Sequence, residues 1–267
     1  MTAPKQRTSP GRLDDSRPGD VLSLADLTWR VGGRTIVDAV CLDVSPGELL
    51  AVIGPNGAGK TSLFNLITGF IRPTGGRIVV NGQDVTRMPP HRRVPHGLGR
   101  TFQTSSVFAS MSVRENVEIA AQAAIGGPWK SLAPWARITA GARTRGRDAL
   151  DRTRLGDRAD LPAGALSHGE KRKLELAIVL AGAAQVVLLD EPMAGMAMEE
   201  VPELTDLIGA IHRGGATVLM VEHHMDVVLD IAERIAVLHH GELIAHGSAA
   251  DVAADPVVRE AYMGVTL

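Results

Sequence analysis

A glycine-rich octapeptide carries the clearest chemistry in the sequence. This segment, Gly54–Thr61, called the phosphate loop below, runs G-P-N-G-A-G-K-T and matches G-x-x-x-x-G-K-[ST] at every fixed position. Its glycines let main-chain N–H groups converge on phosphate oxygens without a Cβ in the way. The Lys60 ammonium would neutralise β- and γ-phosphates, and the Thr61 hydroxyl can ligate Mg²⁺. The residues that we expect to surround the phosphates are Gly54, Pro55, Asn56, Gly57, Ala58, Gly59, Lys60, Thr61 and Ser62.

The sequence on both sides of the phosphate loop has the context that phosphate binding needs. Glu48–Ile53 is mostly apolar and predicts a buried strand before the loop. After the loop, one face of an expected helix carries Leu63, Leu66, Ile67 and Phe70. The N-terminus of that helix adds a partial positive charge beside the phosphates. A glycine-rich turn without a ligand is the alternative, and the complete motif in this context makes it the weaker interpretation.

Two adjacent carboxylates follow a second apolar run. Val186–Leu189 is continuously apolar, which is typical of a central parallel strand, and Asp190 and Glu191 come directly after it. The carboxyl ends of such strands form the usual ligand edge of a parallel sheet. We expect Asp190 to bind Mg²⁺ and Glu191 to orient or deprotonate an attacking water. Two exposed acids that merely close a strand are the alternative, which the phosphate loop disfavours.

Strand and helix patterns alternate around these segments and indicate an α/β sheet. Ala216–Val221 is predicted as a buried strand, and Val201–Arg213 as a helix that a Gly-Gly pair ends. The middle of the chain, roughly 104–184, is rich in Ala, Arg and Glu and is expected to be mostly helical. Within it, Ser167 and Glu170 form an S-x-x-E capping box. Apolar residues follow at helical spacing, namely Leu174, Ala177, Ile178 and Ala181.

Composition excludes several classes of protein. The chain has 267 residues, 45% of them hydrophobic, which is enough for one large domain with a sizeable core. Lys plus Arg number 28 and Asp plus Glu 30, so the net charge of −2 gives no signal for nucleic acid. Cys41 is the only cysteine, which excludes an internal disulfide and a multi-cysteine zinc site. Leu176–Leu189 is too short to span a bilayer, and residues 1–20 are expected to be a disordered tail without a secretory signal.

Further motifs, in a fixed order, give the chain a resemblance to the ATP-binding-cassette (ABC) ATPases. Leu166–Glu170 (L-S-H-G-E), called the signature segment below, resembles the family's L-S-G-G-Q and lies one helix before Asp190. Gln103, in R-T-F-Q, is similar to the family's Q-loop glutamine. His223 stands after a strand, where the family has its switch histidine. The resemblance covers roughly residues 21–264.

This resemblance implies a P-loop NTPase with a RecA-like core, an antiparallel β subdomain and an inserted α-helical subdomain at about 104–184. It implies ATP and Mg²⁺ as ligands, and two subunits paired head-to-tail. In such a pair, Ser167 and Gly169 of one subunit face the phosphate loop of the other. The residues implied in catalysis are Glu191, His223 and Gln103. The residues implied as metal ligands are Thr61, Gln103 and Asp190.

The sequence departs from the family pattern at four positions. In the signature segment, His168 replaces the first of the paired glycines and Glu170 replaces the glutamine. Ala197 stands in the loop where the family usually has Asp or Asn after the acidic pair. Val31 stands where an aromatic residue that stacks on adenine is expected. Either Val31 packs on the base, or Trp29 on the same strand face takes over that contact.

Several stretches are similar to the importer branch for branched-chain amino acids and urea, namely residues 99–103, 112–117 and 241–264. Because Ser167–Gly169 and Ala194–Met196 are most similar to the urea-transport ATP-binding subunit, urea is the first hypothesis and branched-chain amino acids the second. The resemblance implies integral membrane permease subunits, a second ABC ATPase subunit, identical or different, and indirectly a solute-binding protein. It implies a peripheral position on the cytoplasmic face of the cell membrane.

Other functions stay open from the sequence alone. The ATPase of a lipopolysaccharide-type exporter is a close relative, and a non-transport cassette ATPase would act in DNA repair or translation. A regulator that binds nucleotide without hydrolysis is a further class, against which Glu191 argues. The arginine-rich stretch Trp129–Arg158 could contact lipid headgroups or a partner's loop. Its interleaved aspartates favour a solvated helical face instead.

Overall fold

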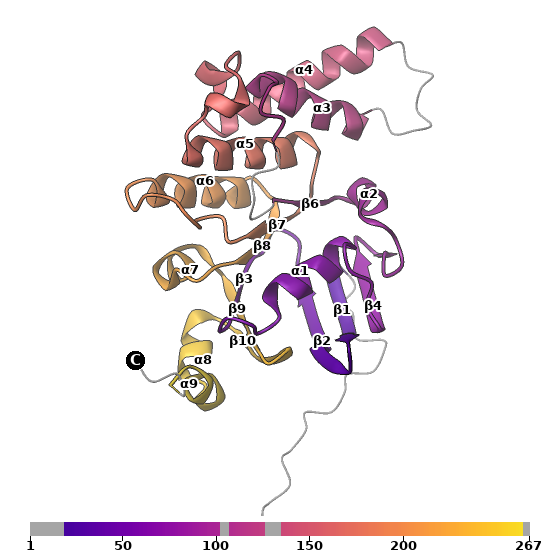
Figure 1. The fold of residues 1–267 in the computed structure, drawn as a ribbon, viewed down its shortest axis with the longest axis vertical. Coiled ribbons are helices and arrows are strands. Elements are labelled where there is room, and N and C mark those ends of the chain that lie inside the picture. Colours follow the sequence, from indigo (N-terminus) through magenta and orange to yellow (C-terminus); the bar gives the residue numbers. More distant parts are fainter. Residues whose placement is uncertain (1–18, 102–106, 126–134, 264–267) are drawn as a thin grey trace, which may run out of the picture.

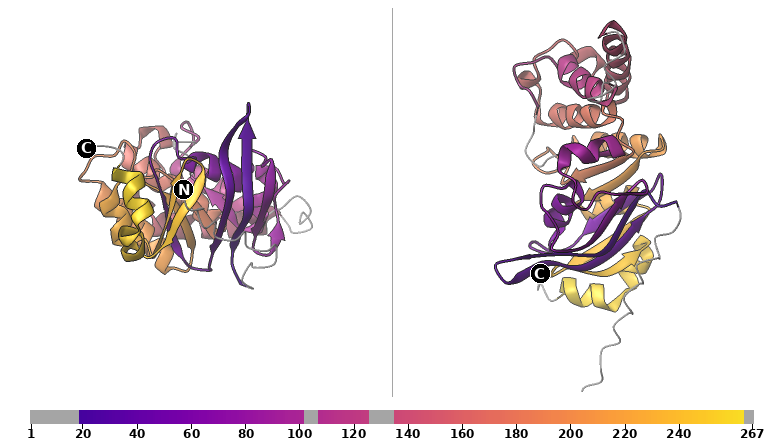
Figure 2. Two further views of the ribbon diagram at one scale, coloured as in Figure 1. Left: turned by 90° about the horizontal axis from the view of Figure 1, so that it is seen from below. Right: turned by 90° about the vertical axis from the view of Figure 1, so that its right-hand side faces the viewer.

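The computed structural model describes residues 19–101, 107–125 and 135–263. The expected tail up to residue 18, Gln103 and Trp129 therefore lie outside the described residues. The described chain forms a larger lobe with two sheets and a smaller lobe of helices (Figure 1). Seen from the side, the antiparallel sheet and the C-terminal helices lie at one end and the helical lobe at the other (Figure 2).

A six-stranded sheet forms the centre of the larger lobe, in the order β10-β9-β3-β8-β7-β6. Its strands are β3 (Leu49–Ile53), β6 (Leu98–Arg100), β7 (Val186–Asp190), β8 (Thr217–Val221), β9 (Arg234–His239) and β10 (Glu242–Gly247). All neighbours are parallel except β9 and β10. Since every residue of β3, β7 and β8 is buried, these strands are covered on both faces, as their continuous apolar runs predict.

Helices cover the two faces of this sheet through separate hydrophobic clusters. Leu50 of β3 packs in a cluster with helix α1 (Lys60–Thr68), and its neighbour Ala51 packs in the other cluster with α6 (Val201–Arg213). Successive side chains of a strand point to opposite faces, which explains this division. The sheet order places the C-terminal ends of β3, β8 and β7 next to one another, so the segments that follow these strands meet at one edge.

A four-stranded antiparallel sheet packs against the α1 side of the core. Its order is β2-β1-β4-β5, with β1 (Leu22–Val31), β2 (Arg34–Val44), β4 (Gly75–Val80) and β5 (Gln83–Asp84). Buried residues of β1 and β2, such as Leu27 and Val40, belong to the same cluster as Phe64 of α1. This sheet is the expected antiparallel β subdomain.

In the described part of the chain, three α-helices form the smaller lobe, as expected for the middle of the chain. They are α3 (Val113–Ile125), α4 (Trp135–Arg152) and α5 (His168–Ala181). They share one cluster, in which Val117, Leu150 and Leu174 are buried. The α4 arginines Arg143 and Arg147 are exposed, so the described part of the arginine-rich stretch presents a solvated face.

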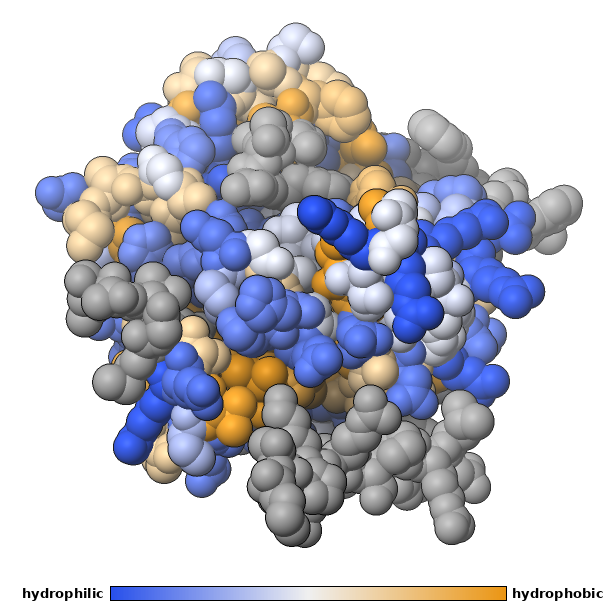
Figure 3. Space-filling model, turned by 60° about the horizontal axis from the view of Figure 1, so that its bottom comes forward, coloured by the Kyte–Doolittle hydropathy of each residue, from blue (hydrophilic) through white to orange (hydrophobic). Residues whose placement is uncertain are grey.

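Short elements connect these parts and end the described chain. They are α2 (Pro90–Arg93), η1 (Val94–His96), η2 (Gly156–Arg158), η3 (Ala163–Ala165), α7 (Met225–Ile231), α8 (Ala249–Ala254) and α9 (Pro256–Met263). Among the described residues, no helix is long and apolar enough to cross a membrane. The face in Figure 3 is mostly hydrophilic, with apolar side chains gathered in small patches.

The predicted elements agree with the structure except at one helix end. The helix 201–213 has the predicted bounds, and the predicted strands around β3, β7 and β8 differ from the observed ones by at most one residue at an end. The prediction that Phe70 continues the apolar face of the helix after the phosphate loop is wrong. Gly69 caps α1 in the left-handed conformation, with φ of 84°, and Phe70 beyond it is 56% exposed.

Candidate functional site

The phosphate loop joins β3 to α1, and its glycines are required by close backbone contacts. Gly54 has φ of 152°, and a Cβ there would lie 2.1 Å from the carbonyl oxygen of Leu238. Gly59 caps α1 with φ of 102°, and a Cβ there would lie 2.8 Å from the carbonyl oxygen of Ile36. Both positions therefore exclude a side chain. The loop is held against β9 and β2, and the N-terminus of α1 faces the space beside it.

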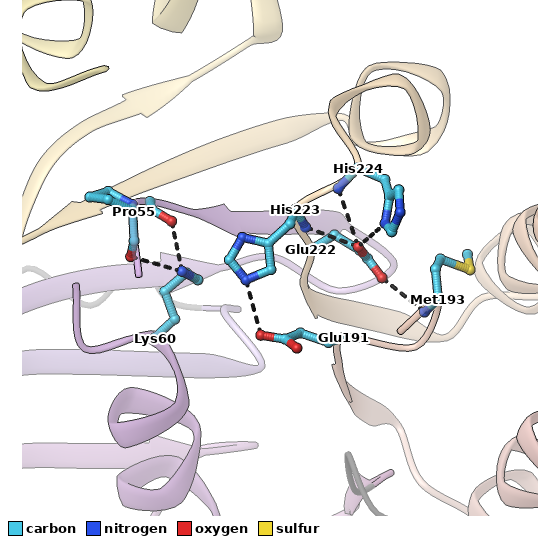
Figure 4. Close-up of polar contacts among 8 residues, drawn as sticks. Pro55, Lys60, Glu191, Met193, Glu222, His223 and His224 are labelled. Carbon is cyan, nitrogen blue, oxygen red and sulfur yellow. Dashed lines mark hydrogen bonds and ion pairs between the residues drawn. The ribbon is translucent and has the colours of Figure 1, made fainter. Parts of the chain in front are cut away.

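Lys60 lies folded back across the phosphate loop. Its Nζ donates hydrogen bonds to the carbonyl oxygens of Gly54 at 2.7 Å and Pro55 at 3.1 Å (Figure 4). The side chain is 6% exposed, and burial lowers the pKa of Lys60, while the nearby charges of Glu191 and Asp190 act in the opposite direction. An ammonium that is buried and not fully compensated is well placed to bind an anion.

Asp190 and Glu191 lie at the end of β7 but have different partners. Asp190 is 3% exposed, and its Oδ2 accepts a hydrogen bond from Nη2 of Arg100 at 2.6 Å. Glu191 has φ of 49°, a left-handed conformation that is strained for a glutamate, and its amide donates to the carbonyl of Val221 in β8 at 2.9 Å. Its Oε1 lies 3.0 Å from Nε2 of His223 (Figure 4). The structure therefore brings the predicted Glu191 and His223 together.

The neighbouring carboxylate of Glu222 organises the loops around this pair. Glu222 is 2% exposed and accepts hydrogen bonds from the amides of Met193 and His223, both at 2.9 Å. Nδ1 of His224 lies 3.1 Å from Oε2 of Glu222, so the rings of the two adjacent histidines have different carboxylate partners (Figure 4). His223, and not His224, contacts Glu191.

A cavity of about 240 Å³ lies where the phosphate loop, Glu191 and His223 meet. Its lining residues are Ile36, Asn56, Gly57, Ala58, Gly59, Lys60, Thr61, Ser62, Glu191 and His223. All of them except Ile36 were predicted site residues. Val31 is not among them; it is 52% exposed near the end of β1, while Trp29 packs against the core. The contact of Val31 with a base stays a prediction.

The signature segment leads into the N-terminus of α5. It lies outside this cavity, because neither Ser167 nor Gly169 is among the lining residues. The predicted capping box is confirmed: Oγ of Ser167 accepts from the Glu170 amide at 3.2 Å, and the Ser167 amide donates to Glu170 Oε2 at 2.9 Å. Nε2 of His168 lies 3.2 Å from the carbonyl oxygen of Ala194, in the loop after β7. The two departures from the family pattern in this segment therefore have local roles, Glu170 in capping and His168 in contacting the core.

Two oxygen donors fit the expected magnesium ion. Among the described residues, no group of three or more His, Cys, Asp or Glu side chains could hold a metal alone. The Thr61 hydroxyl and the Asp190 carboxylate supply oxygen ligands, which Mg²⁺ prefers, and Mg²⁺ is usually held by few protein ligands together with phosphates and waters. The third predicted ligand, Gln103, lies outside the described residues.

Sequence inspection missed two residues of this site. Ile36 reaches the cavity because the β1–β2 hairpin lies beside the phosphate loop, which is a contact between sheets that no local pattern reports. Arg100 binds Asp190 because β6 pairs with β7, with Arg100 opposite Leu188. A parallel pairing of this kind joins residues far apart in sequence, so the only available signal was a charged residue at the end of a short apolar segment.

Comparison with known proteins gives consistent matches over most of the chain. A family model described as "ABC transporter" matches residues 37–194, and one described as "Branched-chain amino acid ATP-binding cassette transporter" matches residues 242–266. The chain is 35% identical over 255 residues to the high-affinity branched-chain amino acid transport ATP-binding protein BraF of Pseudomonas aeruginosa, covering 93% of this chain and 99% of that protein. It is 36% identical over 231 residues to the lipopolysaccharide export system ATP-binding protein LptB of Acidithiobacillus ferridurans, covering 86% and 91%.

Solved structures match at the level of the whole fold. The ADP conformation of MJ1267, an ATP-binding cassette of an ABC transporter, superposes with a TM-score of 0.79 at 29% identity, covering 92% of this chain and 99% of that one. A nucleotide-free ATP-binding cassette from an ABC transporter gives a TM-score of 0.77 at 28% identity, covering 91% and 98%.

Proposed function

Because this chain belongs to the ABC transporter family of ATPases, we propose that it is the ATP-hydrolysing subunit of an importer for branched-chain amino acids. The observation that carries this choice of substrate is the match of residues 242–266 to the branched-chain amino acid cassette model. In the structure these residues begin with β10, the antiparallel edge strand, and continue through α8 and α9. The BraF relative is similar over 99% of its length, and its name also refers to branched-chain amino acid transport. The urea hypothesis stays a prediction, which these matches do not test.

The geometry supports a different role for each group of site residues during ATP hydrolysis. The loop amides and Lys60 would bind the phosphates, and Ile36 would face the nucleoside side of the cavity. Thr61 and Asp190, together with Gln103, would hold Mg²⁺, which when bound offsets phosphate charge. Glu191 would accept a proton from, or orient, the attacking water, and His223 holds the Glu191 carboxylate through its 3.0 Å contact.

A second ATPase chain would complete the site. Neither Ser167 nor Gly169 lines the cavity in its own chain, and Ser167 at the N-terminus of α5 is exposed to a nucleotide on another chain. Amides at the N-terminus of α5 favour an anion, which suits the γ-phosphate on a partner's phosphate loop. Binding of ATP would then close two chains on each other, and hydrolysis would release them.

An apolar groove supplies a surface for a membrane partner. A cavity of about 390 Å³ separates the helical lobe from the core and is lined mainly by apolar residues of α3, α5 and the segment from α1 to β6, including Phe70, Val94 and Ala123. Phe70 and Val94 are at least half exposed. An exposed apolar surface of this kind suits contact with a partner protein. We assign the groove to a cytoplasmic helix of the permease, at the inner face of the membrane.

Uptake in cells tests the proposed substrate. In a strain that lacks the chromosomal copy, the wild-type chain should restore uptake of labelled leucine, isoleucine and valine, and Glu191→Gln should not. Uptake of labelled urea should be the same with and without the chain. Restored urea uptake with unchanged amino-acid uptake would replace our proposal with the urea hypothesis.

Variants of α3 test the groove. Ala123 is exposed and lines the groove, so Ala123→Glu should leave the chain folded but place a charge in the apolar contact. Ile119 is 40% exposed on the same helix and does not line the groove, so Ile119→Glu is the matched control. Copurification with the membrane subunits should be lost in Ala123→Glu alone, while both variants keep the ATPase rate of the isolated chain. Equal copurification would exclude the groove as the docking site.

Lipopolysaccharide export is the second candidate, because the LptB relative is 36% identical over most of the chain. Under that function, depletion of the chain would cause precursors of lipopolysaccharide to accumulate at the inner membrane, and amino-acid uptake would be unaffected. The two outcomes exclude each other, so one depletion strain separates the candidates.

A further inference from the structure

A buried arginine binds the carboxylate that we expect to hold magnesium. The Arg100 side chain is 7% exposed, and its Nη2 lies 2.6 Å from Oδ2 of Asp190, which is 3% exposed. Its Nη1 donates to Oδ1 of Asn65 at 2.7 Å and to Oγ1 of Thr68 at 3.1 Å. Asn65 and Thr68 belong to α1, the helix that starts at the phosphate loop. The guanidinium is therefore fixed from one side by α1 and binds Asp190 on the other.

A carboxylate that is this deeply buried requires a compensating charge. Arg100 supplies one, and a magnesium ion bound by the same carboxylate would supply a second. Two cations that share one buried carboxylate repel each other across a medium of low polarity. The affinity of Asp190 for Mg²⁺ is thus set partly by how firmly Arg100 is held beside it.

We propose that Arg100 is a positioning residue that keeps Asp190 in place as its counter-ion and lowers the affinity of the site for Mg²⁺. This inference rests on the proposed role of Asp190 as a magnesium ligand. It assigns Arg100 no contact with the reacting atoms. As a consequence, Arg100 balances the buried charge of Asp190 between turnovers. The site then binds Mg²⁺ firmly only when a nucleotide binds with it.

The same side chain also lines the apolar groove. The guanidinium carbon of Arg100 lies 6.0 Å from the ring centroids of both Phe64 and Phe70, and Arg100 and Phe70 are both lining residues of the groove. A permease helix seated there would lie against the wall of the groove that Arg100 forms together with the exposed Phe70. Docking of the permease should therefore change the magnesium requirement of the wild-type chain, and should not change that of a chain without the Arg100 charge.

Binding of a fluorescent ADP analogue, measured as a function of Mg²⁺ concentration, tests the proposal without any turnover. Arg100→Gln removes the charge and keeps an amide donor, so the half-saturating Mg²⁺ concentration should fall about tenfold. Nucleotide binding in EDTA should stay within about twofold of wild type. Arg92→Gln, at an exposed arginine of α2, is the matched control and should behave as wild type. An unchanged or raised magnesium requirement in Arg100→Gln would overturn the proposal.

A second variant covers the case in which Arg100→Gln does not fold. Asn65→Leu removes one acceptor that holds the guanidinium and leaves the ion pair with Asp190 intact, so it should fold and shift the magnesium requirement in the same direction by a smaller factor. A shift in the opposite direction would contradict the proposal.

If no variant and no wild-type chain binds nucleotide, the proposed function fails instead. If permease docking shifts wild type and Arg100→Gln equally, the link between the groove and Asp190 is refuted.

Discussion

The phosphate-loop side and the signature side of this ATPase are built in different ways. The first is fixed by buried strands: backbone contacts hold Gly54 against β9, and Glu191 is joined to His223. The second is the start of α5, where Ser167 and His168 are exposed and the His168 ring makes a hydrogen bond with the Ala194 carbonyl of the core. Under the proposed pairing of two chains, one chain suffices to bind a nucleotide, and hydrolysis needs the signature side of the other chain.

The largest effect should come from the proposed base on the phosphate-loop side. Glu191→Gln keeps the size of the side chain and its contact with His223 but cannot accept a proton, so the rate of ATP hydrolysis should fall at least about 100-fold. ATP affinity should change little, and an ATP-bound dimer should accumulate in size-exclusion chromatography. Glu199→Gln, at an exposed glutamate in the loop after β7, is the control. Unchanged turnover in Glu191→Gln would show that another group is the base.

A negative charge introduced on the signature side should distinguish nucleotide binding by one chain from ATP hydrolysis by two paired chains. In Ser167→Asp, at an exposed N-cap position that tolerates aspartate, the new carboxylate would meet the γ-phosphate of a partner's nucleotide, and a like-charge contact of this kind costs several kcal/mol. ATP-dependent dimerisation and hydrolysis should therefore fall about tenfold or more. ATP binding by the isolated chain, followed by fluorescence, should stay the same. A matching loss of binding in the isolated chain would mean that the two sides are not separate.

The contact between the two sides should have a smaller effect. His168→Phe fills the same space without the hydrogen bond to the Ala194 carbonyl, a loss of about 1 kcal/mol. We expect a several-fold lower kcat with unchanged KM, because the loop after β7 is held less firmly when the signature side is engaged. His168→Gln, which keeps a donor, should recover most of the rate. A higher KM for ATP in His168→Phe would instead place this histidine on the nucleotide.

The same contrast explains how far the sequence alone could predict this molecule. The elements of the phosphate-loop side were predictable because their signals are local: the loop motif, the apolar run of β7 and the Gly-Gly pair after α6. The capping box at Ser167 was predictable for the same reason. The pairs Arg100–Asp190 and His168–Ala194 were not, because each joins segments that meet only after the sheet or the lobes have assembled. Phe70 was misplaced because a glycine inside a helical pattern does not by itself mark the helix end.

The smallest expected effect concerns an ion pair between the lobes. Nζ of Lys173 in α5 lies 2.6 Å from Oε1 of Glu203 in α6, and Nη1 of Arg154 lies 3.6 Å from the same oxygen. The hydrogen bond from Lys173 is the main cause that lowers the pKa of Glu203 from its ordinary value of 4.5. A carboxyl group whose pKa is lower in the folded than in the unfolded state stabilises the folded state at every pH above its unfolded-state pKa. This contribution is lost as the pH falls through the lower, folded-state pKa.

Because Glu203 is 42% exposed, Glu203→Gln should lower the free energy of unfolding by less than about 1 kcal/mol at neutral pH. The difference from wild type should shrink in high salt, which screens the pair, and should vanish below the lowered pKa, where wild-type Glu203 is protonated. Asp206→Asn, at an exposed carboxylate of the same helix, is the matched control and should show no such pH dependence. Urea unfolding at a series of pH values from neutral to acidic measures both variants. A loss of several kcal/mol in Glu203→Gln would mean that this pair, and not the packing of α5 on the core, holds the signature side in place.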